Sequence, residues 1–176
     1  MTTIPSSYLA CIGLGSNLGQ PLRLLRDAWR ALAECPAIMP LRLSSPYRTK
    51  PVGMDSLNWF VNAAGLLRTE LPPEALLNVL LEIEQRFGRI RFPERAGYQD
   101  RTLDLDLLLA EELVLRTERL ILPHPFLHER LFALAPLAEI APQLRHPLLG
   151  RTVAELLTEL EQETAPGEVE QTRWED

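Results

Sequence analysis

The run Arg101-Thr102-Leu103-Asp104-Leu105-Asp106-Leu107-Leu108-Leu109 places two carboxylates in a stretch that is otherwise almost entirely leucine. Its alternation is typical of a β-strand, in which successive side chains point to opposite faces. Asp104 and Asp106 would share one face, about 7 Å apart at roughly 3.4 Å per residue, while Leu103, Leu105 and Leu107 face the core. Two like charges this close raise each other's pKa or bind a cation, and hard divalent ions prefer oxygen ligands. We interpret the pair as a magnesium site; solvated aspartates on an exposed strand face are the alternative.

Arginines gather immediately upstream of this strand. Five of the sixteen residues from Arg86 to Arg101 are arginine, in a chain whose net charge is -6. Arginine grips phosphate through paired hydrogen bonds, so an arginine loop leading into two carboxylates fits a nucleoside triphosphate held through Mg²⁺. A solvated basic loop is the simpler alternative. The acidic balance and the 6% aromatic content argue against a nucleic-acid-binding surface.

The elements around the strand predict an α/β (α+β) fold. Apolar runs predict strands at 8–14, 41–48 and 62–69, and helical periodicity predicts helices from Pro21 to about Ala33 and from Pro73 to Phe87. With the Asp104 strand added, the order is βαββαβ, which is the ferredoxin-like arrangement with an antiparallel sheet. Residues 113–116 and 119–122 are expected to form short extra strands, and 127–138 and 153–160 to form C-terminal helices.

Length and composition fit one domain over residues 1–160. The 176 residues are 46% hydrophobic, which is enough for a substantial core. No uninterrupted apolar run approaches the length of a membrane span, so we expect a soluble, cytoplasmic protein without membrane contact. The two cysteines, Cys11 and Cys35, are expected to be free thiols without a chemical role. The acidic segment 161–176 is expected to be a flexible tail.

Two further motifs were weighed for chemistry. Gly13-Leu14-Gly15-Ser16-Asn17-Leu18-Gly19 departs from the dinucleotide fingerprint because its third glycine is one residue late. Its glycines are expected to allow a tight strand-to-helix turn, with Ser16 and Asn17 bonding local backbone. His124 lies between Pro123 and Pro125 and is therefore a loop residue. We favour a phosphate or nucleotide contact for it over a merely packed loop histidine.

Five segments in order carry a family resemblance: GLGSNLG at 13–19, SSPYRTKPVG at 44–53, WFVNAAG at 59–65, RTLDLDLLL at 101–109 and LPHPFLHERLFALAPLAEIAP at 122–142. Together they resemble the 6-hydroxymethyl-7,8-dihydropterin pyrophosphokinases. The resemblance implies transfer of the β,γ-pyrophosphoryl group of ATP to the hydroxymethyl group of the dihydropterin, releasing AMP, in folate synthesis. It also implies two Mg²⁺ ions and a ferredoxin-like fold, and leaves open an association with other folate-pathway enzymes.

The resemblance assigns roles position by position. Asp104 and Asp106 match the magnesium ligands, and Arg89 and Arg101 match loop arginines tied to catalysis. The implied ATP contacts are Leu81, Glu84, Arg91, Leu107, Arg119, His124 and Arg130. The implied pterin contacts are Thr49, Lys50, Pro51, Val52, Phe60, Asn62 and Phe132. The arginine loop would close over the triphosphate and exclude water, and its arginines, being exposed, would add little to folding stability.

The chain departs from the family pattern in two places. Many relatives carry Arg-Trp-Gly-Pro-Arg before the aspartates, whereas this chain has Arg95-Ala96-Gly97-Tyr98-Gln99-Asp100-Arg101, which is two residues longer and has no tryptophan. Tyr98 is a candidate replacement for that ring. Pro125 stands where some members have tyrosine, which removes a hydroxyl but leaves His124.

Two other functions fit part of the pattern. A metal-dependent nucleotide-sugar transferase also uses Asp-x-Asp, but would need a larger doubly wound domain than this length supplies. A nucleotide-sensing ferredoxin-like module would not need a pterin pocket, yet Asn62 and Phe132 are both present. The nucleotide product formed with Mg-ATP and the dihydropterin separates the three.

Overall fold

The computed structural model describes residues 5–50, 57–90 and 99–174. Its first part follows the predicted βαββαβ order, with the second strand in two pieces. The elements are β1 Tyr8–Ser16, α1 Pro21–Leu32, β2 Ile38–Leu43, β3 Tyr47–Thr49, β4 Phe60–Thr69, α2 Pro73–Arg86 and β5 Asp104–Ala110. The sheet has the order β5-β1-β4-β3-β8, with β2 also paired to β4, and every pairing is antiparallel. This confirms the predicted α+β fold class.

The second part of the chain adds a hairpin, helices and one late strand. The elements are β6 Leu115–Arg116, β7 Ile121–Leu122, the 3₁₀ turn η1 Leu127–Glu129, α3 Leu131–Ile140, α4 Val153–Glu163 and β8 Val169–Gln171. The predicted short hairpin is present, since β6 pairs with β7. None of the helices within the described ranges is long and apolar enough to cross a membrane.

Three expected elements differ from the structure. The strand expected over 41–48 is interrupted at Ser44-Ser45-Pro46, where the Ser44 hydroxyl accepts the Ala64 N–H and replaces a ladder contact. The helix expected over 127–138 is a 3₁₀ turn followed by α3, because Arg130 between them is extended at φ -116°, ψ 97°. The expected flexible tail contains β8, which pairs with β3.

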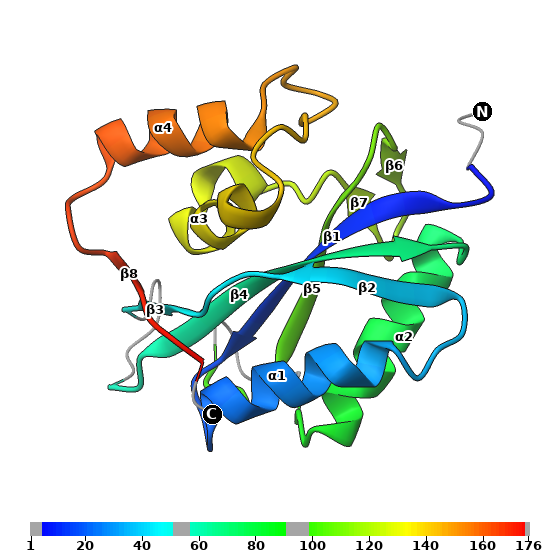
Figure 1. The fold of residues 1–176 in the computed structure, drawn as a ribbon, viewed down its shortest axis with the longest axis horizontal. Coiled ribbons are helices and arrows are strands. Elements are labelled where there is room, and N and C mark those ends of the chain that lie inside the picture. The colour runs from blue at the N-terminus through cyan, green and yellow to red at the C-terminus, as the bar shows by residue number, and fades with distance from the viewer. Residues whose placement is uncertain (1–4, 51–56, 91–98, 175–176) are drawn as a thin grey trace.

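Helices cover both faces of the sheet. Figure 1 shows α1 and α2 on one side and α3 and α4 on the other. Leu103, Leu105 and Leu107 lie in the buried cluster under α1 and α2, which confirms the core-facing set predicted for this strand. Leu108 and Leu109 lie in the second cluster, with α3 and α4. Both aspartates of β5 therefore lie on the α3 side of the sheet.

Two glycines of the 13–19 motif, Gly13 and Gly15, lie in strand β1 beside the aspartates. Gly13 is opposite Asp106 in the ladder and Gly15 is opposite Asp104. A Cβ atom on Gly15 would lie 3.0 Å from Oδ1 of Asn62. Gly15 thus leaves space at the sheet surface beside Asn62, while the turn into α1 is made at Gly19, whose φ is +71°.

Candidate active site

A cavity of about 960 Å³ lies on the α3 side of the sheet, above the ends of β1, β4 and β5. Most predicted site residues that the structure describes line it. They are Thr49, Lys50, Phe60, Asn62, Leu81, Glu84, Arg89, Arg101, Asp104, Asp106, His124, Arg130 and Phe132. The fold thus gathers residues from β3, β4, α2, β5 and α3 around one space.

Five predicted residues are not among those lining the cavity. Leu107 is buried in the core under α1 and α2, because its position alternates away from the aspartates. Arg119 lies on the surface, where Nη2 donates to Oδ1 of Asn78 at 2.6 Å. The structure therefore does not place these two at the cavity. Pro51, Val52 and Arg91 lie outside the described residues, as does Tyr98.

Asp106 lies in a half-buried position two residues from Asp104. Burial raises its pKa to about 6, and the charge of Asp104 raises it further, while Arg130 and Arg101 act in the opposite direction. A nearby cation stabilises the ionised form of such a carboxylate. Within the described residues no group of three or more histidine, cysteine or acidic side chains could hold a metal. Two carboxylates with further oxygens from phosphate and water are nevertheless a donor set that suits Mg²⁺.

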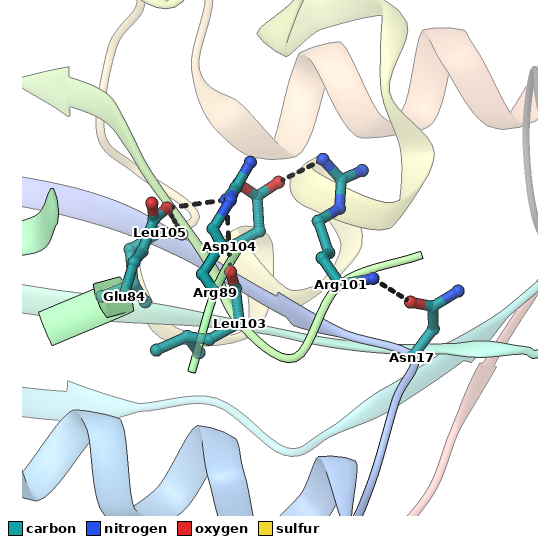
Figure 2. Close-up of polar contacts among 7 residues, drawn as sticks. All are labelled: Asn17, Glu84, Arg89, Arg101, Leu103, Asp104 and Leu105. Carbon is teal, nitrogen blue, oxygen red and sulfur yellow. Dashed lines mark hydrogen bonds and ion pairs between the residues drawn. The ribbon is translucent and has the colours of Figure 1, made fainter. Parts of the chain in front are cut away.

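Arg89 joins helix α2 to strand β5 (Figure 2). Its Nη1 donates to Oε1 of Glu84 at 2.8 Å, to the Leu103 carbonyl at 3.2 Å and to Oδ1 of Asp104. The same Glu84 oxygen accepts the Leu105 N–H at 2.8 Å, and Glu84 is only 2% exposed. The Glu84 carboxylate is therefore engaged by protein groups, and it fixes the guanidinium beside Asp104.

Arg101 approaches Asp104 from the opposite side (Figure 2). Its Nη1 lies 3.1 Å from Oδ2 of Asp104, and its guanidinium lies 5.3 Å from the ring centre of Phe60. Its backbone is held by Asn17, which accepts the Arg101 N–H at 2.8 Å and donates its own N–H to the Arg101 carbonyl at 3.1 Å. Asn17 was expected to bond local backbone. Instead it clamps Arg101, in the segment that leads into β5, through a long-range contact without a local sequence signal.

His124 and Arg130 form another wall. The His124 N–H donates to the Leu108 carbonyl at 2.8 Å, and its Nδ1 accepts the Phe126 N–H at 3.2 Å. Burial and the nearby Arg130 charge lower the pKa of His124 to about 4. The imidazole is therefore neutral at pH 7, with Nε2 as the N–H donor. Arg130 lies over the rings of Phe126 and Phe132, at 5.4 and 5.7 Å.

The far end of the cavity contains an amide and a hydroxyl. The Asn62 amide nitrogen donates to the Thr49 hydroxyl at 2.9 Å, and both side chains are buried. This bond leaves the Asn62 carbonyl oxygen and one amide hydrogen for another partner. A flat polar ring with donors and acceptors on one edge matches such a pair.

Sequence reasoning missed the segment after α4. Residues 164–169 line the cavity together with Leu160. Pro166-Gly167, a strong turn signal, precedes the extended residues of β8 and could have indicated order there. Leu77 and Leu131 also line the cavity and were not predicted.

Comparisons with known proteins identify relatives over most of the chain. Residues 11–142 match the family model of 7,8-dihydro-6-hydroxymethylpterin-pyrophosphokinase. The 2-amino-4-hydroxy-6-hydroxymethyldihydropteridine pyrophosphokinase of Methylorubrum extorquens is 45% identical over 152 residues, covering 86% of this chain and 93% of that protein. The Bacillus subtilis enzyme of the same name is 43% identical over 136 residues, covering 77% and 80%.

Solved structures share the fold. The Plasmodium falciparum HPPK-DHPS structure with pteroate superposes with a TM-score of 0.71 at 13% identity, covering 94% of this chain. This chain spans only 48% of that longer chain. At this identity the likeness concerns the fold alone. The family match and the two bacterial relatives show that the chain belongs to the 7,8-dihydro-6-hydroxymethylpterin-pyrophosphokinase family.

Proposed function

We propose that the cavity carries out the reaction of this family on the residues described above, transferring the pyrophosphoryl group of Mg-ATP to 6-hydroxymethyl-7,8-dihydropterin and releasing AMP. The observation that carries the assignment is that one cavity holds Asp106, the Asn62–Thr49 pair, and Asp104 flanked by two arginines. The aspartates and arginines suit a metal-bound phosphate chain. The Asn62–Thr49 pair suits a polar heterocycle. The cavity volume of about 960 Å³ leaves room for both substrates.

Asp104 and Asp106 would hold Mg²⁺, two ions by the family resemblance. Bound there, the metal would neutralise phosphate oxygens and favour deprotonation of the attacking hydroxyl. Protein side chains would make the remaining contacts to the phosphate chain. Arg89 and Arg101 flank Asp104 and would bind the phosphate oxygens of ATP. Neutral His124 offers an N–H to the phosphate chain without adding a charge.

The Asn62–Thr49 pair would orient the pterin. Its amide and hydroxyl can pair with the ring edge, while Phe60 and Phe132 provide apolar surface for the ring faces. Removing the Asn62 amide leaves buried polar partners unsatisfied, so Asn62→Ala should weaken pterin binding by about 1–3 kcal/mol. ATP binding should change little; an equal loss of both ligands would indicate a folding defect instead.

The test measures the nucleotide product. The purified protein is incubated with Mg-ATP and the hydroxymethyl dihydropterin, and AMP is separated from ADP by chromatography. Asp104→Ala and Asp106→Ala should reduce AMP formation by several orders of magnitude, because both carboxylates are needed for the metal. Asp27→Ala, which removes a partly exposed carboxylate that pairs with Arg23 on helix α1, is the control and should leave the rate unchanged. ADP as the product, or near-normal AMP formation in either variant, would refute the proposal.

An association with other folate-pathway enzymes is the proposed partnership. Its support is that solved chains called HPPK-DHPS contain a region with this fold within a longer polypeptide.

A further inference from the structure

The C-terminal strap, which we define as residues Thr164–Gln171, lies outside the residues that match the family. Figure 1 shows the chain leaving α4 and running along one side of the molecule to β8, beside β3. Pro166 and Gly167 form a turn, and Gly167 has φ +81°, a conformation that favours glycine. The strap then adds a strand to the outer edge of the sheet.

Both ends of the strap are anchored. At its start, the Thr164 hydroxyl donates to the Leu160 carbonyl at 2.7 Å. Beyond its end, the Thr172 N–H donates to the Pro46 carbonyl at 2.8 Å, and Nε1 of Trp174 donates to the Ser44 carbonyl at 3.0 Å. The Trp174 ring also packs against the main core cluster. A segment held in this way is a fixed part of the structure.

The strap lies against the strand that carries Thr49. Val169 is opposite Thr49 in the β3–β8 ladder, and Arg48 is opposite Glu170. Thr49 in turn accepts the hydrogen bond from the Asn62 amide. Residues 164–169 line the same cavity as this pair. The strap therefore fixes the backbone behind Thr49 and supplies part of the cavity wall.

The position of the strap within the sheet indicates which substrate it affects. Strands β8 and β5 lie at opposite edges of the sheet, in the order β5-β1-β4-β3-β8. Arg89, Glu84 and the aspartates lie at the β5 edge, with helix α2. The strap is thus next to the Asn62–Thr49 end and at the opposite edge of the sheet from Arg89 and Glu84.

We infer that the C-terminal strap is a positioning element for the pterin substrate: by pairing with β3 it holds Thr49 in place and closes the heterocycle end of the cavity. The inference rests on the proposed function, which assigns that end to the pterin. Loss of the pairing should weaken pterin binding and leave nucleotide binding intact.

The ladder offers a matched pair of variants. Because the Thr172 N–H bonds Pro46, the alternation of an antiparallel ladder makes Arg48 and Glu170 the next hydrogen-bonded pair. Glu170→Pro removes the N–H that points to β3, whereas Gln171→Pro removes one that points away from the sheet. Replacement of residues 164–171 by a Gly-Ser linker of equal length disfavours strand β8 while keeping Thr172 and Trp174, and it gives a second reading if Glu170→Pro fails to fold.

Pterin binding is measured by fluorescence titration with Mg²⁺ and α,β-methylene ATP, and nucleotide binding by calorimetry without pterin. Glu170→Pro and the linker variant should raise the pterin Kd at least about tenfold, equivalent to ~1.4 kcal/mol, with the nucleotide Kd within twofold of the parent value. Gln171→Pro should match the parent in both. An unchanged pterin Kd in Glu170→Pro overturns the inference, and if Glu170→Pro misfolds, an unchanged pterin Kd in the linker variant does so. Equal loss of both ligands overturns it as well. If the parent itself binds no pterin and forms no AMP, the proposed function fails instead.

Discussion

The carboxyl group of Asp106 is buried beside a second carboxylate. Its pKa of about 6 lies above the value of 3.8 for an unperturbed aspartate, mainly because of burial and then because of the Asp104 charge. As pH rises from about 4 to 6, the unfolded chain loses this proton first, so the free energy of unfolding falls, and the loss is complete above the folded pKa. Without ligands, the folded protein is therefore more stable when the Asp106 carboxyl is neutral.

Asp106→Asn should therefore stabilise the ligand-free protein at pH 8 while abolishing activity. We expect the Tm measured with EDTA to rise by at least about 3 °C at pH 8, and the gain to vanish near pH 4, where the parent also carries a proton. Asp27→Asn on the exposed face of α1 is the control and should show no such dependence. A gain of equal size at both pH values would contradict the account.

The two arginines beside Asp104 are more buried than their place in the sequence suggested. Only 11% of the Arg89 side chain and 19% of the Arg101 side chain are exposed. The premise that these arginines are exposed is therefore wrong. We expect Arg89 to contribute to folding, because its removal takes away the partner that Glu84 and Asp104 share. Removing one member of a buried ion pair typically costs about 3 kcal/mol.

Arg89→Ala should consequently lower the Tm more than Arg101→Ala does. For a protein of this size 1 kcal/mol corresponds to roughly 2–4 °C. A double-mutant cycle with Glu84→Gln, read by urea unfolding, should give a coupling energy of about 1 kcal/mol or more. Additive effects of Arg89→Ala and Glu84→Gln would show that the pair contributes nothing to folding.

At the scale of elements, the sequence pattern predicted those helices and strands whose apolar residues recur on one face. The β5 face carrying Asp104 and Asp106 was predictable because its leucines alternate with the aspartates. Helices α1 and α2 were predictable because apolar residues recur on one side after a proline start. The Asn17 clamp was not, since it is a contact with a distant segment. The break at Arg130 was not, since one extended residue leaves no mark in the apolar periodicity. Strand β8 was not predicted, because its pairing at the sheet edge uses backbone groups, which leave no apolar pattern in the sequence.

The contact between α1 and β4 gives a prediction on stability alone. A Cβ atom at Gly65 would lie 2.3 Å from the Trp29 ring, far inside contact distance, whereas one at Gly13 would lie 3.4 Å from Leu108. Gly65→Ala should therefore destabilise the fold by about 1–3 kcal/mol through overpacking. Gly13→Ala should be milder in urea unfolding. Equal midpoints for the two variants would show that α1 can shift away from the sheet.

At the scale of the whole molecule, the cavity joins segments from across the chain. Its walls come from β1, β3, β4, α2, β5, α3, α4 and the strap, so ligands that bind there favour the folded state as a unit. A ligand at 100 times its Kd adds about 2.7 kcal/mol to stability. At roughly 2–4 °C per kcal/mol, this corresponds to a Tm rise of about 5–11 °C.

The metal should control this rise, because Asp104 and Asp106 repel a bare triphosphate and attract it only through a cation. With Mg²⁺ and α,β-methylene ATP we expect the full rise in thermal unfolding, and with EDTA most of it should be lost. Asp106→Asn should show little difference between the two conditions, since it has lost one of the two ligands. A nucleotide-induced rise that survives EDTA in the parent protein would mean that Arg89, Arg101 and Arg130 hold the triphosphate without a metal, and the role assigned to the carboxylate pair would have to be given up.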